Sequence, residues 1–259
     1  MRRALLLGLL VVALIAAGCG DDDDTETTTD TSAPDETETD SETDTETETE
    51  SAETSSTTAA PTPSELPGQR IDIFPNDGVE LGVVGVEADD VLNVRAAPGV
   101  EYEVVAELDP LADGILPTGH NRQLDDCSIW AEIDAGGETG WASTAFLAHL
   151  GATRDTTSEL YPEVADRPRG DTMLQLGELV ADQVAGDGEP EPEVVVVDGP
   201  TVGDLGEITV DVVGFPDDSV LGERLHIFAE PDPGGESFTV RTVESTTLCR
   251  RGVSDGLCV

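Results

Sequence analysis

The chain has 259 residues and a formal net charge of −44, with 56 acidic residues against 12 basic ones. Proteins bind nucleic-acid phosphates through clustered lysine and arginine, so this balance argues against a nucleic-acid partner. The length allows two modest domains, and since aromatic residues make up only 3% of the chain, aliphatic side chains must fill their cores.

Residues 1–18 have the build of an export signal. Arg2 and Arg3 precede the apolar run Ala4–Ala17, which is too short to cross a membrane core that needs about 20 residues. The run ends in Ile15-Ala16-Ala17-Gly18-Cys19, which resembles the lipobox of bacterial lipoproteins. The resemblance implies a diacylglycerol thioether on Cys19 and a chain anchored in the lipid bilayer at the outer face of the cell membrane, facing the wall. An ordinary cleaved signal is the alternative.

Residues 19–66 predict a tether. From Asp21 to Leu66 there are 17 acidic residues and no basic one, alternating with threonine and serine. The segment has no apolar period of 2 or 3.6, so neither a strand nor a helix has a face to bury. High charge with few apolar residues predicts disorder, and we expect a stalk between the membrane and the folded part.

Residues 67–150 predict a small all-β unit, because short aliphatic runs alternate with Gly, Pro and Asp. The expected strands are Val91–Arg95, Tyr102–Leu108, Gly114–Thr118, Ile129–Ile133 and Thr139–Ala142, with a turn over 121–126. Five short strands in so few residues favour a barrel, since closing a sheet removes its exposed edges.

The motifs of this unit occur in a specific order. Leu92-Asn93-Val94-Arg95 precedes Ala97-Pro98-Gly99, followed by Trp130-Ala131-Glu132-Ile133 and by Gly140-Trp141-Ala142. Residues of about 85–149 thereby resemble the bacterial SH3 domain, a β-barrel family of cell-wall enzymes and envelope proteins. The resemblance implies noncatalytic binding of envelope peptides or glycans, often those of peptidoglycan.

The same resemblance implies five candidate ligand contacts. Trp130, Tyr102 and Trp141 would offer apolar platforms, while Asn93 and Arg95 would supply hydrogen bonds or pair with a carboxylate. Each has a structural alternative. Trp141 can be a core residue and Asn93 a turn contact, and Arg95 can pair with Asp89, Asp90 or Glu132.

The C-terminal region predicts a polar connector over 151–170, ordered only in part, and an α+β unit over 171–259. Apolar residues from Met173 to Val184 recur at helical steps, with Asp171 as the expected N-cap and Gly186 at the end. Strands are expected at Val194–Val197, Ile208–Val213, Arg224–Phe228 and Ser237–Val243, the last two joined across 231–235. The predicted fold class is mainly β: an SH3-like barrel plus one helix on a three- or four-stranded antiparallel sheet.

Cysteine spacing predicts one disulfide. Cys249 and Cys258 are nine residues apart in a chain expected to be exported, so we expect them to be bonded. Cys127 would then be a free, buried thiol. Arg250 and Arg251, inside the loop that this disulfide closes, are either an anion-binding tip or partners of local carboxylates.

The chain lacks the motifs of a known catalytic centre. Its histidines, His120, His149 and His226, show no metal-ligand spacing, so we expect neither a metal nor a cofactor. His120 and Cys127 share one loop rather than the separate elements of a nucleophile and its base, and His226 alternates with strand residues and should face outward. We therefore expect a lipoprotein that binds wall peptide or glycan and is not an enzyme. The alternative is an interaction protein whose C-terminal unit docks an envelope protein while the barrel is a spacer.

Overall fold

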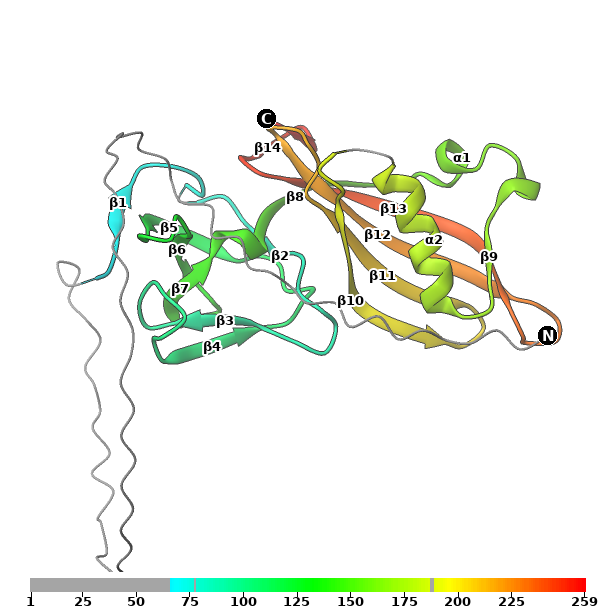
Figure 1. Ribbon diagram of the computed structural model, residues 1–259, viewed down its shortest axis with the longest axis horizontal. Coiled ribbons are helices and arrows are strands. Elements are labelled where there is room, and N and C mark those ends of the chain that lie inside the picture. Colours follow the sequence, from blue (N-terminus) through cyan, green and yellow to red (C-terminus); the bar gives the residue numbers. More distant parts are fainter. Residues whose placement is uncertain (1–65, 77, 187–188) are drawn as a thin grey trace, which may run out of the picture. The chain divides into compact units, whose positions relative to one another are not determined.

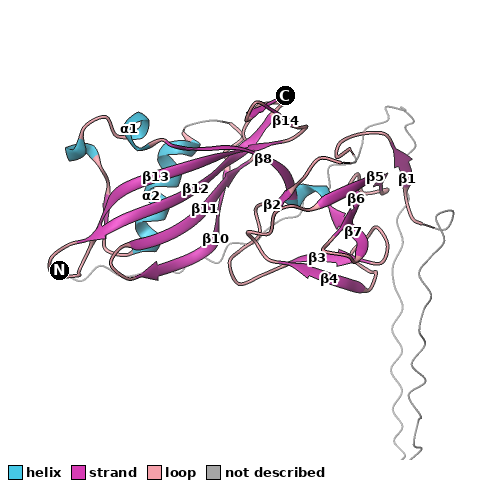
Figure 2. Cartoon of the chain, turned by 180° about the vertical axis from the view of Figure 1, so that it is seen from behind, coloured by secondary structure: helices cyan, strands magenta, loops and turns pink. Residues whose placement is uncertain are grey.

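The computed structural model describes residues 66–76, 78–186 and 189–259, and the chain is mainly β (Figure 1). The expected signal, Cys19 and the tether up to residue 65 lie outside the described residues. Figure 2 shows long strands joined by short loops, with few helices. None of the helices in the described ranges has the length and hydropathy that a membrane span requires.

The first sheet has six antiparallel strands in the order β1-β5-β6-β7-β3-β4. Their bounds are β1 (Gln69–Ile71), β3 (Leu92–Arg95), β4 (Val104–Leu108), β5 (Leu116–Gln123), β6 (Ile129–Asp134) and β7 (Thr139–Ser143). All five expected strands are present. β5 runs into the expected turn, which is confined to 124–128, where the N–H of Leu124 donates to the carbonyl of Ser128 at 2.9 Å. Small and aliphatic side chains fill the core of this part, among them Val94, Ile133 and Ala142.

The second sheet has the order β10-β11-β12-β13-β8-β2. Its bounds are β2 (Gly82–Val83), β8 (Leu147–Asp155), β10 (Glu193–Val202), β11 (Gly206–Val213), β12 (Val220–Pro231) and β13 (Phe238–Cys249), and the short β9 (Arg169–Gly170) also pairs with β13. The expected antiparallel hairpin across 231–235 is confirmed as β12–β13. The expected size of three or four strands was too small, because β8 and β2 extend the sheet beyond β13.

One helix covers a face of this sheet. Figure 1 shows α2 (Met173–Ala185) lying across β10 and β11. Its Leu176 and Val180 are buried against Ile208 and other aliphatic residues of the sheet. The predicted N-cap was wrong by one residue: the Thr172 hydroxyl, not Asp171, accepts from the N–H of Gln175 at 3.1 Å. The helix ends at Gly186, whose φ of 64° suits glycine.

The stretch expected to be a partly ordered connector is structured. Strand β8 crosses residue 150, pairing with β2 at its start and with β13 from His149 onward. Short helices α1 (Thr157–Leu160) and η2 (Val164–Asp166) follow it, and the Thr157 hydroxyl accepts from the N–H of Val243 at 2.8 Å. Polar composition misled the prediction, because the second half of β8 is solvent-exposed and carries no apolar alternation.

The predicted disulfide between Cys249 and Cys258 is present, with the two Cα atoms 5.1 Å apart. The disulfide joins the end of β13 to the hairpin of β14 (Val253–Ser254) and β15 (Leu257–Cys258). The prediction of a free, buried Cys127 was wrong: the described cysteines include no free thiol, and Cys127 is half-buried. The prediction was made by elimination, after Cys19 had been assigned to a lipid and Cys249 and Cys258 to a disulfide. The spacing of cysteines in the sequence cannot test such an elimination.

Candidate binding cleft

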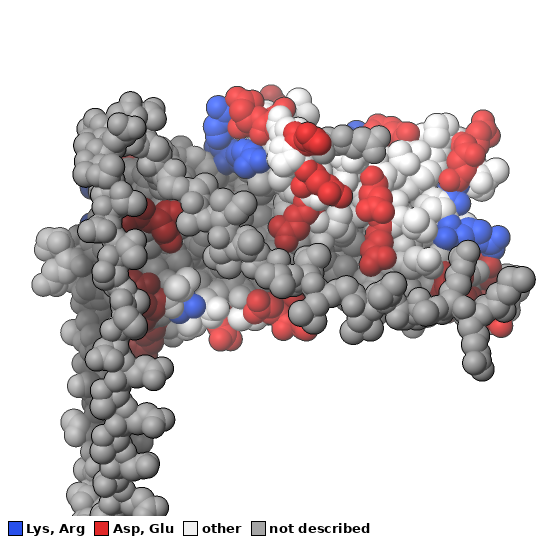
Figure 3. Space-filling view, viewed as in Figure 1, with Lys and Arg blue, Asp and Glu red and all other residues white. Residues whose placement is uncertain are grey.

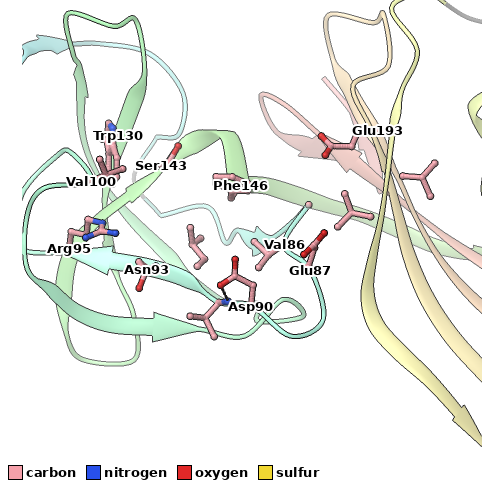
Figure 4. A pocket seen from close by; sticks show the side chains of 15 residues that line it. Val86, Glu87, Asp90, Asn93, Arg95, Val100, Trp130, Ser143, Phe146 and Glu193 are labelled. Carbon is pink, nitrogen blue, oxygen red and sulfur yellow. Dashed lines mark hydrogen bonds between the residues drawn. The ribbon is translucent and has the colours of Figure 1, made fainter. Parts of the chain in front are cut away.

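A cleft of about 410 Å³ opens beside strands β3 and β6 (Figure 4). The short helix η1 (Thr144–Phe146) and the loop before β3 also border it, and β10 supplies the opposite wall. The lining side chains used below are Glu87, Asp90, Asn93, Arg95, Val100, Trp130, Phe146, Glu193 and Val194. This cleft is the candidate site.

Three of the five predicted contacts meet in this cleft. Asn93 and Arg95 alternate along β3 with buried Leu92 and Val94, so they lie on the face opposite the core. Arg95 donates from Nη1 to the carbonyl of Tyr102 at 2.7 Å, and no described ion pair joins it to an acidic residue. Its remaining N–H groups can serve a ligand.

Trp130 reaches the cleft from β6 but is only 5% exposed. Its indole Nε1 donates to the hydroxyl of Ser128 at 3.2 Å. The ring therefore forms part of the cleft floor. Because most of it is buried, Trp130 has a structural role in addition to any contact with a ligand.

The two other predicted contacts lie elsewhere. Trp141 is 4% exposed and lines a smaller pocket of about 200 Å³ with Arg70 and His120. That burial agrees with the core alternative. Tyr102 is half-buried and lines neither pocket.

The residues of the opposite wall were not predicted from the sequence. Glu193 and Val194 belong to β10, about a hundred residues from Asn93, and only sheet pairing brings them near. Figure 4 shows Glu193 across the opening from Asn93 and Trp130. Val100, 75% exposed, and Phe146 add apolar surface at the rim. No sequence signal marks Phe146 as a cleft residue, because its exposure follows from the fold.

The electrostatics of the cleft are asymmetric. Glu87, Asp90 and Glu193 are exposed carboxylates, whereas Arg95 is the one cation among the lining residues. Acidic side chains are also scattered over the face drawn in Figure 3, where basic ones occupy few places. The cleft can therefore attract an amine along most of its length and a carboxylate at Arg95.

The described histidines lie on three different strands, His120 on β5, His149 on β8 and His226 on β12. His149 is buried in β8, its Nδ1 lies 3.0 Å from the carbonyl of Glu80, and burial lowers its pKa. His226 lies on the outer face of β12 beside the Phe228 ring, as predicted. In the described ranges no three His, Cys, Asp or Glu residues gather to hold a metal ion.

The two arginines near the C-terminus have local partners. Arg251 pairs with the carboxylate of Asp218 at 3.0 Å, and Arg250 donates to the backbone carbonyls of Asp217 and Phe215. These contacts favour the second alternative, in which the pair balances its surroundings rather than forming an anion-binding tip.

No protein-family model matches this chain, and neither the curated proteins nor the solved structures contain a match. The candidate site therefore rests on its own geometry and chemistry.

Proposed function

We propose that this protein is an envelope lipoprotein whose SH3-like barrel binds cell-wall peptide or glycan without catalysis. The main observation in its support is that one cleft is lined by three residues selected from the sequence motifs. They come from two strands, Asn93 and Arg95 from β3 and Trp130 from β6. The cleft combines apolar surface with a few polar groups, which is the usual composition of a small-ligand site.

The strand order supports the assignment of the SH3-like barrel. The Leu92–Arg95 motif forms a strand between the β4 hairpin partner and β7, which carries the closing Gly140-Trp141-Ala142 motif. Gly140 allows β7 to approach β3 closely: a Cβ built there would lie 2.7 Å from Cγ1 of Val94. These motif residues thus serve the fold, and the ligand contacts must come from the residues around the cleft.

The proposed anchor places this cleft on the wall side of the membrane. A diacylglycerol on Cys19 supplies two acyl chains, which hold a protein at a bilayer where one chain binds only weakly. Because the chain has four cysteines and Cys249 is bonded to Cys258, the proposed thioether on Cys19 is an alternative to a disulfide between Cys19 and Cys127. The acidic stretch from Asp21 to Leu66 would then carry the folded part outward.

The net charge of −44 limits the ligand chemistry. Such a protein repels anionic polymers at low ionic strength and binds neutral or cationic groups without that penalty. Of the wall components, peptides with amino groups and neutral glycans fit this condition.

Sedimentation of the full-length protein with purified cell-wall sacculi tests the proposal. We expect binding that Asn93→Ala weakens, because this half-buried side chain lines the cleft and has no hydrogen bond within the described residues. Tyr102→Phe, outside the cleft, is the matched control and should bind normally. Trp130→Ala is a poor probe, since removing a buried ring also disturbs the core. A protein that stays in the supernatant with intact sacculi overturns the proposal and leaves the partner-docking alternative.

A further inference from the structure

Strand β10 is an edge strand of the second sheet. It pairs with β11 on one side. On its other side the described backbone makes one contact, in which the N–H of Ala88 donates to the carbonyl of Val196 at 2.9 Å. An edge with unpaired backbone groups is a template for an additional strand.

The position of Val194 on this edge follows from the regular register. Pairing with β11 is continuous from Glu193 to Val196, and residues two apart in a strand direct their backbone groups to the same side. Since the carbonyl of Val196 faces away from β11, the N–H and C=O of Val194 do so too. In the part of the chain that the structure describes, neither group has a partner there.

The open edge faces the candidate cleft. Glu193 and Val194 line the cleft together with Trp130, and a second hollow of about 400 Å³ continues along Val194–Val196 beside the loop of Glu87. The backbone of β10 is thus exposed along a furrow that contains both apolar and acidic side chains. Figure 4 shows Glu87 and Glu193 near each other at this opening.

We propose that an extended peptide bearing a primary amine binds in this furrow as an additional strand on β10. Its backbone C=O and N–H bond to the N–H and C=O of Val194, and its amine lies among the carboxylates of Glu87, Asp90 and Glu193. The inference rests on the proposed function, because it uses the same cleft, and it selects peptide over glycan. A peptide presents alternating donors and acceptors at strand spacing, which a sugar chain does not.

Charge complementarity also decides among the possible occupants. A second copy of the chain carries the same charge of −44, and the stretch Asp21–Leu66 has 17 acidic residues and no basic one. Both would bring carboxylates to a furrow lined by Glu87, Asp90 and Glu193. A peptide with amines is attracted instead.

The test is a titration of the full-length protein with three end-capped pentapeptides, followed by NMR. The first peptide alternates alanine with lysine, the second has glutamate in place of lysine, and the third is the lysine peptide with alternate backbone nitrogens methylated. We expect the lysine peptide to bind and to slow hydrogen exchange of the Val194 amide. The glutamate peptide should not bind, and methylation should weaken binding about tenfold, the loss of one or two hydrogen bonds. Equal binding of the methylated and unmethylated peptides overturns the inference.

A matched pair of variants tests the same hydrogen bond from the protein side. Val194→Pro removes the outward N–H, which β11 does not use, whereas Val194→Ala keeps it. The proline variant should bind the lysine peptide about tenfold more weakly than the alanine variant. If the proline variant does not fold, the methylated peptide on the wild-type chain decides.

Failure of this inference is distinct from failure of the proposed function. If sacculi bind both Val194 variants equally but do not bind Asn93→Ala, the cleft remains the binding site and the binding of a strand to β10 is contradicted. Sacculi that bind none of the proteins, wild type included, would remove the proposed function as well. Glu193→Gln should lower the affinity for the lysine peptide and reduce the salt dependence of its binding.

Discussion

Asp211 and Arg224 face each other across β11 and β12 and form a buried two-point ion pair, with Nε–Oδ1 at 2.7 Å and Nη2–Oδ2 at 2.8 Å. The Arg224 guanidinium also donates to the carbonyl of Val83 at 2.8 Å, and the Asp211 carboxylate accepts from the N–H of Gly85 at 2.9 Å. The pair therefore connects Val83 and Gly85, at the β2 edge of the second sheet, to β11 and β12. Because the segment of Val83 and Gly85 leads into the loop that borders the cleft, the pair helps to fix the distance between the two cleft walls.

Replacing Arg224 by methionine should be strongly destabilising. The side chain of Asp211 is 0% exposed, and a buried carboxylate that loses its partner costs about 3–5 kcal/mol of unfolding free energy. Urea unfolding measures this loss. The control is Arg251→Met, which breaks an exposed pair with Asp218 and should cost less than about 1 kcal/mol. Equal losses in the two variants would contradict the role assigned to the buried pair.

His149 should make stability fall as the pH drops below about 6.5, the ordinary pKa of histidine. Burial lowers its pKa in the folded protein, so on acidification the unfolded chain takes up this proton first and gains stability relative to the native state. The contribution is complete above the unfolded pKa and is lost as the pH falls through the folded one. Thermal melts from pH 7.5 to 5.5 of the wild type and of His149→Gln measure it. Parallel curves would show that another group is responsible.

Gly140→Ala should destabilise the first sheet. A Cβ at this position would lie 2.8 Å from Cγ2 of Val105 and 2.9 Å from the carbonyl oxygen of Arg95. The backbone oxygen cannot move away as a flexible side chain can, so β7 must separate from β3, at a cost of about 1–3 kcal/mol. Chemical denaturation measures the effect. Gly136→Ala makes no such contact and, at a positive φ, tests strain alone. A Gly140→Ala variant less affected than Gly136→Ala would be inconsistent with this packing.

Cys19→Ser should release the protein from the membrane fraction into the medium, since the proposed thioether is its anchor. Peptide mapping of the wild-type protein provides the complementary measurement. We expect an N-terminal peptide that begins at Cys19 and carries diacylglycerol. A Cys19 that can be alkylated, or that is recovered in a disulfide-linked peptide, would contradict the anchor.

The sequence predicted those elements whose pattern is local. In Leu92–Arg95, buried and half-buried residues alternate as a half-exposed strand requires, and Leu176 and Val180 mark the buried face of α2. β8 was missed because its second half is polar and exposed, and its pairing with β13 depends on residues almost a hundred positions later. The cap moved from Asp171 to Thr172 because both residue types cap helices and only the backbone decides between them.

The candidate site was half predictable for a similar reason. Asn93, Arg95 and Trp130 belong to motifs within one small unit, and their order along the chain indicated them. Glu193 belongs to a strand whose place in the sheet is set by pairing with β11, and no nearby residue announces that it faces the cleft.

The most direct measurement is a map of amide chemical shifts as soluble peptide fragments released from sacculi are added to the full-length protein. The proposed function predicts shifts at Asn93, Arg95 and Ser143, which line one wall of the cleft. If a peptide also binds as an additional strand on β10, shifts should occur at Glu193 and Val194 on the other wall. No shift at saturating fragment would contradict the account. Shifts confined to Arg70, His120 and Trp141 would do the same, because they would place the ligand in the smaller pocket.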